Sequence, residues 1–217
     1  KNAQAFYHLG LIKFEQGDYK GAIEEYSLAI KVKPDYVYAY NDRGSAKKQT
    51  GDLKGALNDY QNALSQNPDL AFIYNNIGTT KKKLNDLEGA ILEYSSAIEK
   101  NPGYYVAYNN RGSAKFETND YKAAIADFDE AIKLNPEYLY AFNNRGFAKY
   151  KLRDYKGAVE DFNYAIRKDP EYGYAYLNRG IAKEMMRDLD GACKDWQKAG
   201  SLGVKNGKIY YEQECKK

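Results

Sequence analysis

The stretch from Tyr105 to Tyr138 decides the fold of this chain, and it reads YVAYNNRGSAKFETNDYKAAIADFDEAIKLNPEY. The next stretch, from Leu139 to Tyr172, carries NNRG, AK, DYK, AI and PEY in the same order at an offset of 34 residues. Self-similarity at this period is typical of a stacked helical array, in which each repeat is one helical unit. We therefore number the positions of the unit from 1 to 34, with Tyr105 at position 1.

The rest of the chain fits the same numbering. Position 8 is Gly in all six repeats, positions 20 and 27 are Ala, position 24 is Tyr, Phe or Trp, and all five prolines fall at position 32. We predict a single array over residues 1–217. Its repeats are residues 3–36, 37–70, 71–104, 105–138, 139–172 and 173–206, and a terminal helix follows at about 207–217.

This pattern resembles the tetratricopeptide repeat, whose motif has a large aromatic at position 4, Leu-Gly at 7–8, Ala at 20 and 27, an aromatic at 24 and Pro at 32. The resemblance covers nearly all of the chain, with Lys at position 11 and Arg at position 7 of four repeats as departures. It implies an all-α fold, a right-handed superhelical solenoid of six helix-turn-helix repeats plus a C-terminal capping helix. It also implies a scaffold that holds peptides in a concave groove.

Composition excludes several functional classes. The 33 basic and 30 acidic residues are interspersed, so no nucleic-acid-binding stripe is expected. No apolar run approaches the roughly 18 residues that span a membrane, so no membrane insertion is expected. The single histidine, His8, and the absence of a Gly-rich phosphate loop argue against a metal site, a cofactor or a catalytic triad, and we expect no enzyme. The chain begins with Lys1 rather than Met, and we expect it to be a processed or excised fragment.

Each repeat is predicted to hold a helix A at about positions 2–14 and a helix B at about positions 17–30. Position 16 is Asp in all six repeats, where its side chain can cap the free N–H groups that open helix B. The small residues at positions 8, 20 and 27 let the two helices approach closely, and the aromatic at position 24 fills the space that they leave.

Charged residues also follow the repeat. Arg occupies position 7 in four repeats, and only these four carry Asp at position 23; the other two, with Leu9 and Ile77, carry Glu there. Antiparallel helices that turn near position 15 place positions 7 and 23 opposite each other, so the covariation predicts four half-buried, bidentate Arg–Asp pairs. Lys at position 11 faces Gly or Ala at position 19. We expect the small residue to make room for the lysine stem, whose ammonium reaches water or a neighbouring acid.

A second face of helix A is predicted to line the groove. Asn recurs there at positions 5 and 6, and a carboxamide offers the donor and acceptor that complement a peptide bond. A ladder of them, as in some tetratricopeptide proteins that this chain resembles, would hold an extended backbone without reading its sequence. The alternative is that these side chains bond only the preceding turn or solvate a polar face. The candidate groove residues are Asn41, Asn75, Asn76, Asn109, Asn110, Asn143, Asn144, Asn178, Tyr38, Phe72, Tyr140, Tyr174, Phe116 and Tyr150.

The two cysteines lie near the end of the chain. Cys193 falls early in the last helix B and Cys215 in the terminal helix, which must pack on that helix B. A disulfide between them would close a loop of about 22 residues, stabilise the end by about 3 kcal/mol, and imply an oxidising, periplasmic or otherwise extracytoplasmic compartment. Two unbridged thiols in a cytoplasmic protein are the alternative, since spacing alone does not fix the geometry.

The sequence thus predicts a non-enzymatic scaffold that binds an extended segment of a partner protein in its groove. A competing hypothesis uses Lys48, Lys82, Lys83 and Lys151 to attract an acidic segment. Two other functions stay open: self-assembly into a homo-oligomer through the convex face or the array ends, and service as the recruiting arm of a larger enzyme.

Overall fold

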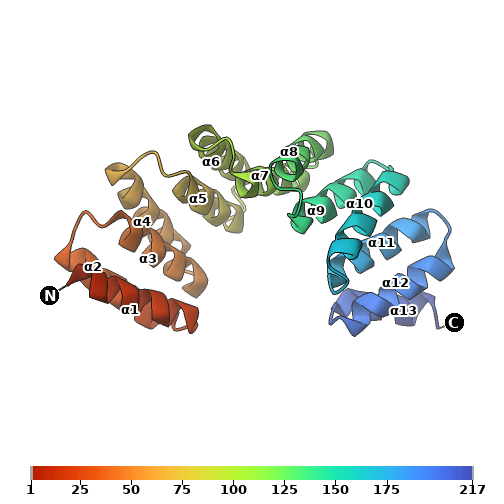
Figure 1. Cartoon of the computed structure of the whole chain (residues 1–217), viewed down its shortest axis with the longest axis horizontal. Coiled ribbons are helices and arrows are strands. Elements are labelled where there is room, and N and C mark those ends of the chain that lie inside the picture. The colour runs from red at the N-terminus through yellow and green to blue at the C-terminus, as the bar shows by residue number, and fades with distance from the viewer. Residues whose placement is uncertain (1, 217) are drawn as a thin grey trace. The chain divides into compact units, whose positions relative to one another are not determined.

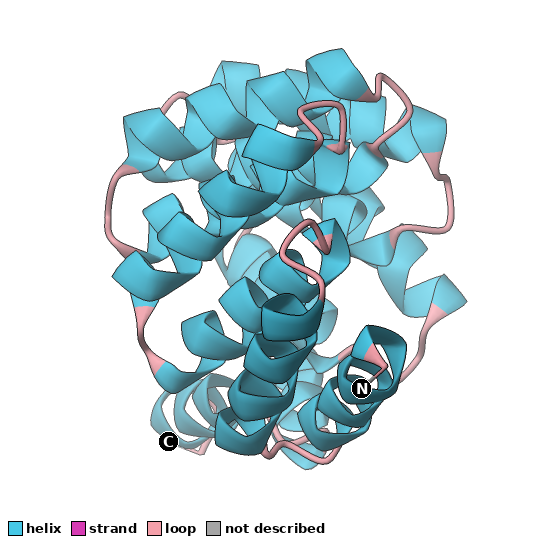
Figure 2. Cartoon of the chain, turned by 90° about the vertical axis from the view of Figure 1, so that its left-hand side faces the viewer, coloured by secondary structure: helices cyan, strands magenta, loops and turns pink. Residues whose placement is uncertain are grey.

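The computed structural model describes residues 2–216, which form helices and connecting loops without a strand (Figure 2). The chain divides into two compact units, and the division falls between Asn110 and Arg111, inside α7. The first unit contains α1 (Ala3–Glu15), α2 (Tyr19–Val32), α3 (Val37–Thr50), α4 (Leu53–Gln66), α5 (Ala71–Lys83), α6 (Leu87–Lys100) and the first part of α7 (Tyr105–Glu117) (Figure 1). The second unit contains the rest of α7 and α8 (Tyr121–Leu134), α9 (Leu139–Lys151), α10 (Tyr155–Lys168), α11 (Gly173–Met185), α12 (Leu189–Ser201) and α13 (Lys205–Glu214).

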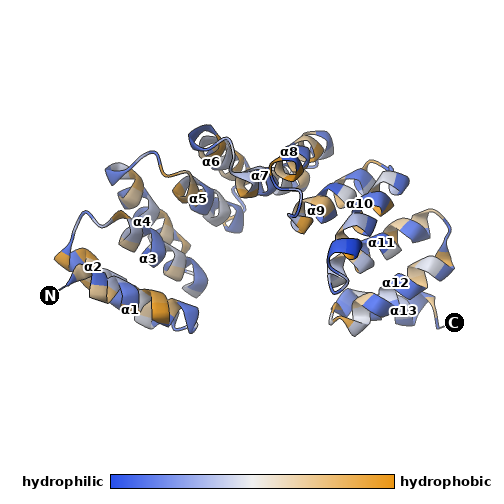
Figure 3. Ribbon diagram, viewed as in Figure 1, coloured by the Kyte–Doolittle hydropathy of each residue, from blue (hydrophilic) through white to orange (hydrophobic). Residues whose placement is uncertain are grey.

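The prediction of an all-α fold built from helix pairs is confirmed. The odd-numbered helices α1 to α11 begin at position 1 of a repeat, and the even-numbered helices begin at position 17. Apolar and polar residues alternate around each helix, as the orange and blue segments of Figure 3 show. Amphipathic helices of this length form when their apolar faces pack against each other, so each helix pair is one packing unit.

The turn between the two helices of a repeat is fixed at positions 15 and 16. Position 15 has positive φ in every repeat: it is Gly in the first two, Asn85 and Asn119 in the next two, and Arg153 and Arg187 in the last two. The Asp at position 16 then caps helix B, accepting a hydrogen bond of 2.9–3.1 Å from the backbone N–H three residues on. This left-handed residue followed by a capping carboxylate ends helix A and starts helix B within two residues.

The core of each repeat is a glycine against an aromatic ring. A Cβ added at position 8 would lie 2.5–2.8 Å from the ring at position 24 in all six repeats, too close for any side chain. The rings themselves are 0–1% exposed, and the alanines at positions 20 and 27 are fully buried beside them. The structure confirms the predicted close approach, which any larger residue at position 8 would destroy.

The four predicted Arg–Asp pairs are confirmed. In each, the arginine Nε and Nη2 donate to the two carboxylate oxygens over 2.6–3.0 Å: Arg43–Asp59, Arg111–Asp127, Arg145–Asp161 and Arg179–Asp195. The Lys at position 11 reaches the same carboxylate over 2.8 Å. In the two repeats without Arg, the lysine pairs with Glu25 or Glu93 over 2.7 Å. Each position-23 acid therefore has at least one cationic partner.

Three of these arginines, Arg43, Arg145 and Arg179, also bridge neighbouring repeats. Their Nη1 donates to a side chain at position 25 of the preceding repeat, which is Ser27 for Arg43, Asp129 for Arg145 and Asn163 for Arg179, over 2.6–3.0 Å. One guanidinium is thus held by two helices B.

The glycines at position 19 leave room for the capping side chain. A Cβ added at any of the five would collide with the capping Asp three residues earlier, and at Gly21 it would also lie 2.9 Å from the Cδ of Lys13. The fourth repeat has Ala123 there and still receives its cap from Asp120 over 3.1 Å. The predicted room for the lysine stem is thus seen at Gly21, together with room for the cap.

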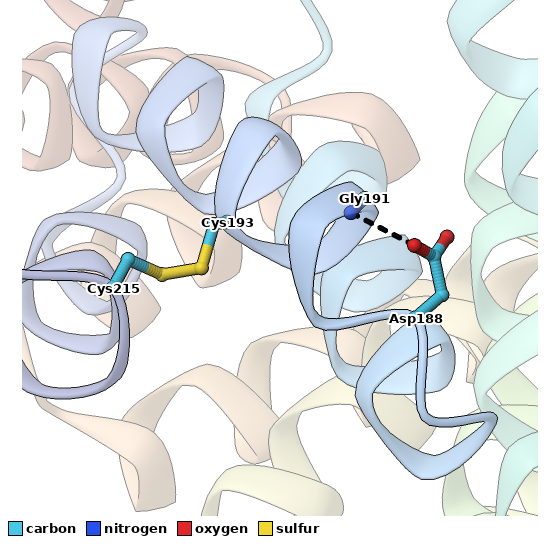
Figure 4. The surroundings of a disulfide bond; sticks show 4 residues. All are labelled: Asp188, Gly191, Cys193 and Cys215. Carbon is cyan, nitrogen blue, oxygen red and sulfur yellow. Dashed lines mark hydrogen bonds between the residues drawn. A yellow bond between two sulfur atoms is a disulfide. The ribbon is translucent and has the colours of Figure 1, made fainter.

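Helix α13 covers the end of the second unit. Gly207 is buried against Ala199 and Gly200 of α12, so the two helices approach closely. Val204 is buried at the position where the other repeats have proline. Cys193 of α12 and Cys215 form a disulfide, with Cα atoms 5.8 Å apart (Figure 4). In the same view Asp188 accepts from the N–H of Gly191 and caps α12.

Candidate functional site

In the first unit, the candidate groove face carries a connected polar network. The Tyr7 hydroxyl donates to Asp42 over 2.6 Å, and the Asn41 amide donates to the other oxygen of Asp42 over 2.8 Å. The Oδ1 of Asn41 in turn accepts from the Nδ2 of Asn76 over 2.9 Å. Burial raises the pKa of the Asp42 carboxyl, and the bonds from Tyr7 and Asn41 oppose that rise. Three consecutive helices A are therefore tied together by this face.

The same asparagine bond recurs elsewhere. Asn110 donates to Asn75 over 2.9 Å in the first unit, and Asn178 donates to Asn143 over 3.0 Å in the second. The position-5 members, Asn41, Asn75, Asn109 and Asn143, are only 6–8% exposed. These asparagine bonds run from one repeat to the next. We therefore correct the expectation that the position-5 carboxamides face a bound backbone, because their side chains are buried between helices.

The position-2 aromatics lie at the solvent-exposed edge of this face. Tyr38 is 51% exposed and Tyr140 and Tyr174 are 59% and 60% exposed. Tyr38 stacks on Phe72 with ring centroids 6.2 Å apart. Tyr140 meets Tyr172 edge-on at 5.7 Å, beside a pocket of about 210 Å³. These rings are accessible, so the structure leaves them available as contacts for a partner.

In the second unit, aromatic rings replace polar side chains on helix A. Phe147 stacks on Phe116 at 5.4 Å and on Tyr150 at 5.7 Å. The Lys151 ammonium lies 5.4 Å from the Phe147 ring centroid, so this lysine is drawn toward the aromatic row. A pocket of about 130 Å³ lies beside these rings and is lined by Ser113, Phe116, Phe128, Asn144 and Phe147.

The predicted groove lysines are spread over both units. Lys48 of the first unit is half-buried, and burial together with the neighbouring Lys83 ammonium lowers its pKa. Position 12 is Phe14, Lys48 and Lys82 in the first unit, and Phe116, Tyr150 and Glu184 in the second. Two repeats of the first unit are therefore basic at this position, and two repeats of the second are aromatic.

Sequence reasoning missed a second pocket, of about 260 Å³, at the C-terminal end of the second unit. Its walls include Tyr150, which was predicted, and Trp196 and Tyr210, which were not. Trp196 was assigned to packing alone because position 24 is a core position in every repeat. Tyr210 belongs to α13, which has no counterpart in the repeats and therefore no pattern to compare.

Two structural features concern membrane insertion and metal binding. Within residues 2–216, no helix is both long and apolar enough to cross a membrane. Over the same residues, no group of three or more His, Cys, Asp or Glu side chains is arranged to hold a metal ion.

Family comparisons agree with the helical pattern. A model described as TPR repeat matches residues 10–51 and 44–85, and models described as tetratricopeptide repeat match residues 73–104, 105–138 and 143–200. The chain belongs to the tetratricopeptide repeat family. Proteins of this family generally act as non-catalytic scaffolds, and a role in protein–protein interaction follows for this chain. A comparison with curated protein sequences finds no significant match.

Solved structures share the fold. The MamA protein is 27% identical, with a TM-score of 0.66, and the match covers 79% of this chain and 94% of that one. PilF of Pseudomonas aeruginosa is 19% identical with a TM-score of 0.83, covering 97% and 95%. YrrB, described as a TPR protein with an unusual peptide-binding site, is 17% identical with a TM-score of 0.66, covering 87% and 97%.

Proposed function

We propose that this protein is a non-enzymatic scaffold that binds an extended segment of a partner protein on the helix A face of its second unit. The observation that carries the proposal is the pocket of about 130 Å³ that the stacked rings of Phe116 and Phe147 line together with Ser113, Phe128 and Asn144. A small pocket with aromatic walls and one carboxamide suits an apolar side chain of a bound peptide.

Energetics favour this pocket as the anchor. Phe116 and Phe147 are both half-buried, so a side chain that enters the pocket beside them covers ring surface still exposed to water. Removing apolar surface from water contributes roughly 25 cal/mol per Å². Asn144 adds a polar group to the wall beside the inserted side chain.

The asparagines have a structural role in this proposal. Those at position 5 are buried and hold the repeats together, and those at position 6 lie beside them and are more exposed to solvent. The specificity therefore comes from Phe116, Phe147 and Tyr150, with Tyr140 and Tyr174 as additional exposed contacts at the edge.

Light scattering distinguishes this proposal from the self-assembly hypothesis. A monomer that binds peptides keeps the same molar mass at all protein concentrations, whereas self-assembly raises the molar mass with concentration.

A selection of random displayed peptides on the wild-type protein tests the proposal. We expect the selected peptides to lose about 2 kcal/mol or more of binding free energy to Phe147→Ala, the usual scale for an aromatic anchor. Leu134→Ala, which shortens an exposed side chain at the end of α8, is the matched control and should bind normally.

Phe147 also packs against the buried cluster of Ala158 and Phe162, so its loss can weaken the fold. The helical content of each variant is therefore measured, and Asn144→Ala serves as a second, milder variant. Peptides that bind both variants as tightly as wild type would move the site away from this pocket.

A further inference from the structure

The pocket beside α13 combines aromatic and acidic walls. Trp196 of α12 and Tyr210 of α13 have ring centroids 5.4 Å apart at an angle of 56°. Tyr150 of α9 and Ile181 of α11 continue the apolar wall, and the pocket measures about 260 Å³. Four helices of the second unit thus contribute to one concave site.

Two carboxylates stand at this wall. Glu184 of α11 and Glu214 of α13 both line the pocket, and both side chains are exposed to solvent. None of the described lining residues is basic. Within residues 2–216, Glu184 takes part in no hydrogen bond or ion pair, in contrast to the acids at position 23, which are all paired with lysine or arginine.

Glu184 is also unusual for its place in the repeat. Position 12 is Lys48 and Lys82 in two repeats of the first unit, and Phe116 and Tyr150 in the two preceding repeats of the second. An acid appears there only in the last repeat, where α13 closes the pocket. The negative charge near Tyr150 adds to burial and to Tyr155 in raising the pKa of the Tyr150 hydroxyl.

We propose that this pocket binds a lysine or arginine side chain of the partner segment. The inference rests on the proposed function, because the pocket begins at Tyr150, the end of the aromatic row that the segment would follow. The aliphatic stem would lie against the partly exposed rings of Tyr150 and Tyr210, and ring faces attract a cation. The charged group would reach Glu184, which supplies the acceptors that an ammonium or guanidinium needs, with the Glu214 carboxylate adding negative charge at the same wall.

Calorimetric titration tests this site, because the Trp196 ring at the back of the pocket is buried and does not contact a ligand directly. Short blocked peptides with a central lysine are titrated into the full chain, and the same peptides with norleucine in place of lysine serve as the uncharged control. We expect the lysine peptide to bind at least tenfold more tightly than the norleucine peptide. We also expect binding to weaken as salt is added.

The matched variants are Glu184→Gln and Glu160→Gln. Both remove one exposed acid of the second unit, but Glu160 lies on α10 and does not line the pocket. Glu184→Gln should weaken the lysine peptide several-fold, whereas Glu160→Gln should leave it unchanged. Thermal melts of both variants check that folding is intact.

Two results would overturn the inference. One is equal binding of the lysine and norleucine peptides, or no measurable binding of either. The other is unaltered affinity in Glu184→Gln. The peptide selection on Phe147→Ala is independent of these titrations, so failure of the cation pocket and failure of the proposed peptide face are told apart.

Discussion

The hydroxyl of Tyr7 donates a hydrogen bond of 2.6 Å to the carboxylate of Asp42, which lies one repeat further along the chain. At the equivalent sites Asn41 accepts from Asn76, Asn75 from Asn110, and Asn143 from Asn178. Where position 5 of one repeat is Tyr, a hydroxyl donor, position 6 of the next is Asp, whose ionised carboxylate only accepts. Where position 5 is Asn, position 6 of the next repeat is also Asn. Position 5 of one repeat and position 6 of the next form a single structural unit.

A double-mutant cycle tests this coupling. Tyr7→Phe and Asp42→Asn should each lower the free energy of unfolding by about 1–3 kcal/mol, because each leaves a part-buried polar group without its partner. Their effects should be non-additive by about 0.5 kcal/mol or more, the range expected for residues in contact. Urea denaturation measures all four proteins. Tyr7→Phe combined with Asp69→Asn, an exposed acid elsewhere in the first unit, is the control and should be additive.

The stability should also depend on pH through Asp42. Burial raises the pKa of this carboxyl above its ordinary value of 3.8, so the folded protein holds the proton more tightly than the unfolded chain does. The resulting stabilisation is present at low pH and is lost as the pH rises through the folded-state pKa. Wild type should therefore gain stability relative to Asp42→Asn as the pH falls from neutral into the acid range. A difference between the two that stays constant with pH would refute this.

The shared carboxylates of position 23 should be costly to remove. Asp161→Asn leaves Arg145 and Lys149 without their common buried partner, so we expect a loss of about 3–5 kcal/mol in unfolding free energy. Glu25→Gln removes the partner of Lys13 alone, in a more exposed pair, and should cost clearly less. Chemical denaturation of the two variants compares them, and equal losses would show that the second cation contributes nothing.

The left-handed turn residues offer a stabilising substitution. Arg153 and Arg187 have φ of 65°, a conformation that costs a residue with a side chain about 1 kcal/mol. Arg153→Gly should therefore raise the melting temperature despite the greater freedom of glycine in the unfolded chain. Arg167→Gly, in the helical part of α10, should instead destabilise by about 1 kcal/mol. If both substitutions lower stability equally, the turn is not strained.

The disulfide should matter most at the C-terminal end. Reduction, or the pair Cys193→Ala and Cys215→Ala, opens a loop whose ends are 22 residues apart, and the chain-entropy model predicts a loss of about 3 kcal/mol. Hydrogen exchange should show that amides of α13 lose protection before those of α9. Titration of thiols in denaturant without reductant checks the bond itself, because two reactive thiols would show that the isolated protein is not bridged.

The helices and the Arg–Asp pairs were predictable because their residue patterns recur in several repeats. Arg at position 7 and Asp at position 23 vary together, and that covariation places two residues in contact within one repeat. The asparagine bonds were not predicted, because they join position 5 of one repeat to position 6 of the next rather than two helices of the same repeat. The pocket beside α13 could not be found this way, since Glu184, Trp196 and Tyr210 occur in a single context without a second copy to compare.

The arginine that bonds Asp161 and Asp129 at once has a consequence for how the second unit unfolds. If α9 and α10 separated from the repeat before them, Arg145 would lose one of its charged partners while remaining beside the other. Arg179 stands in the same relation to Asn163 and Asp195. Neighbouring repeats are therefore coupled in their stability, and we expect them to open together as one cooperative block rather than to fray singly from the end of the array.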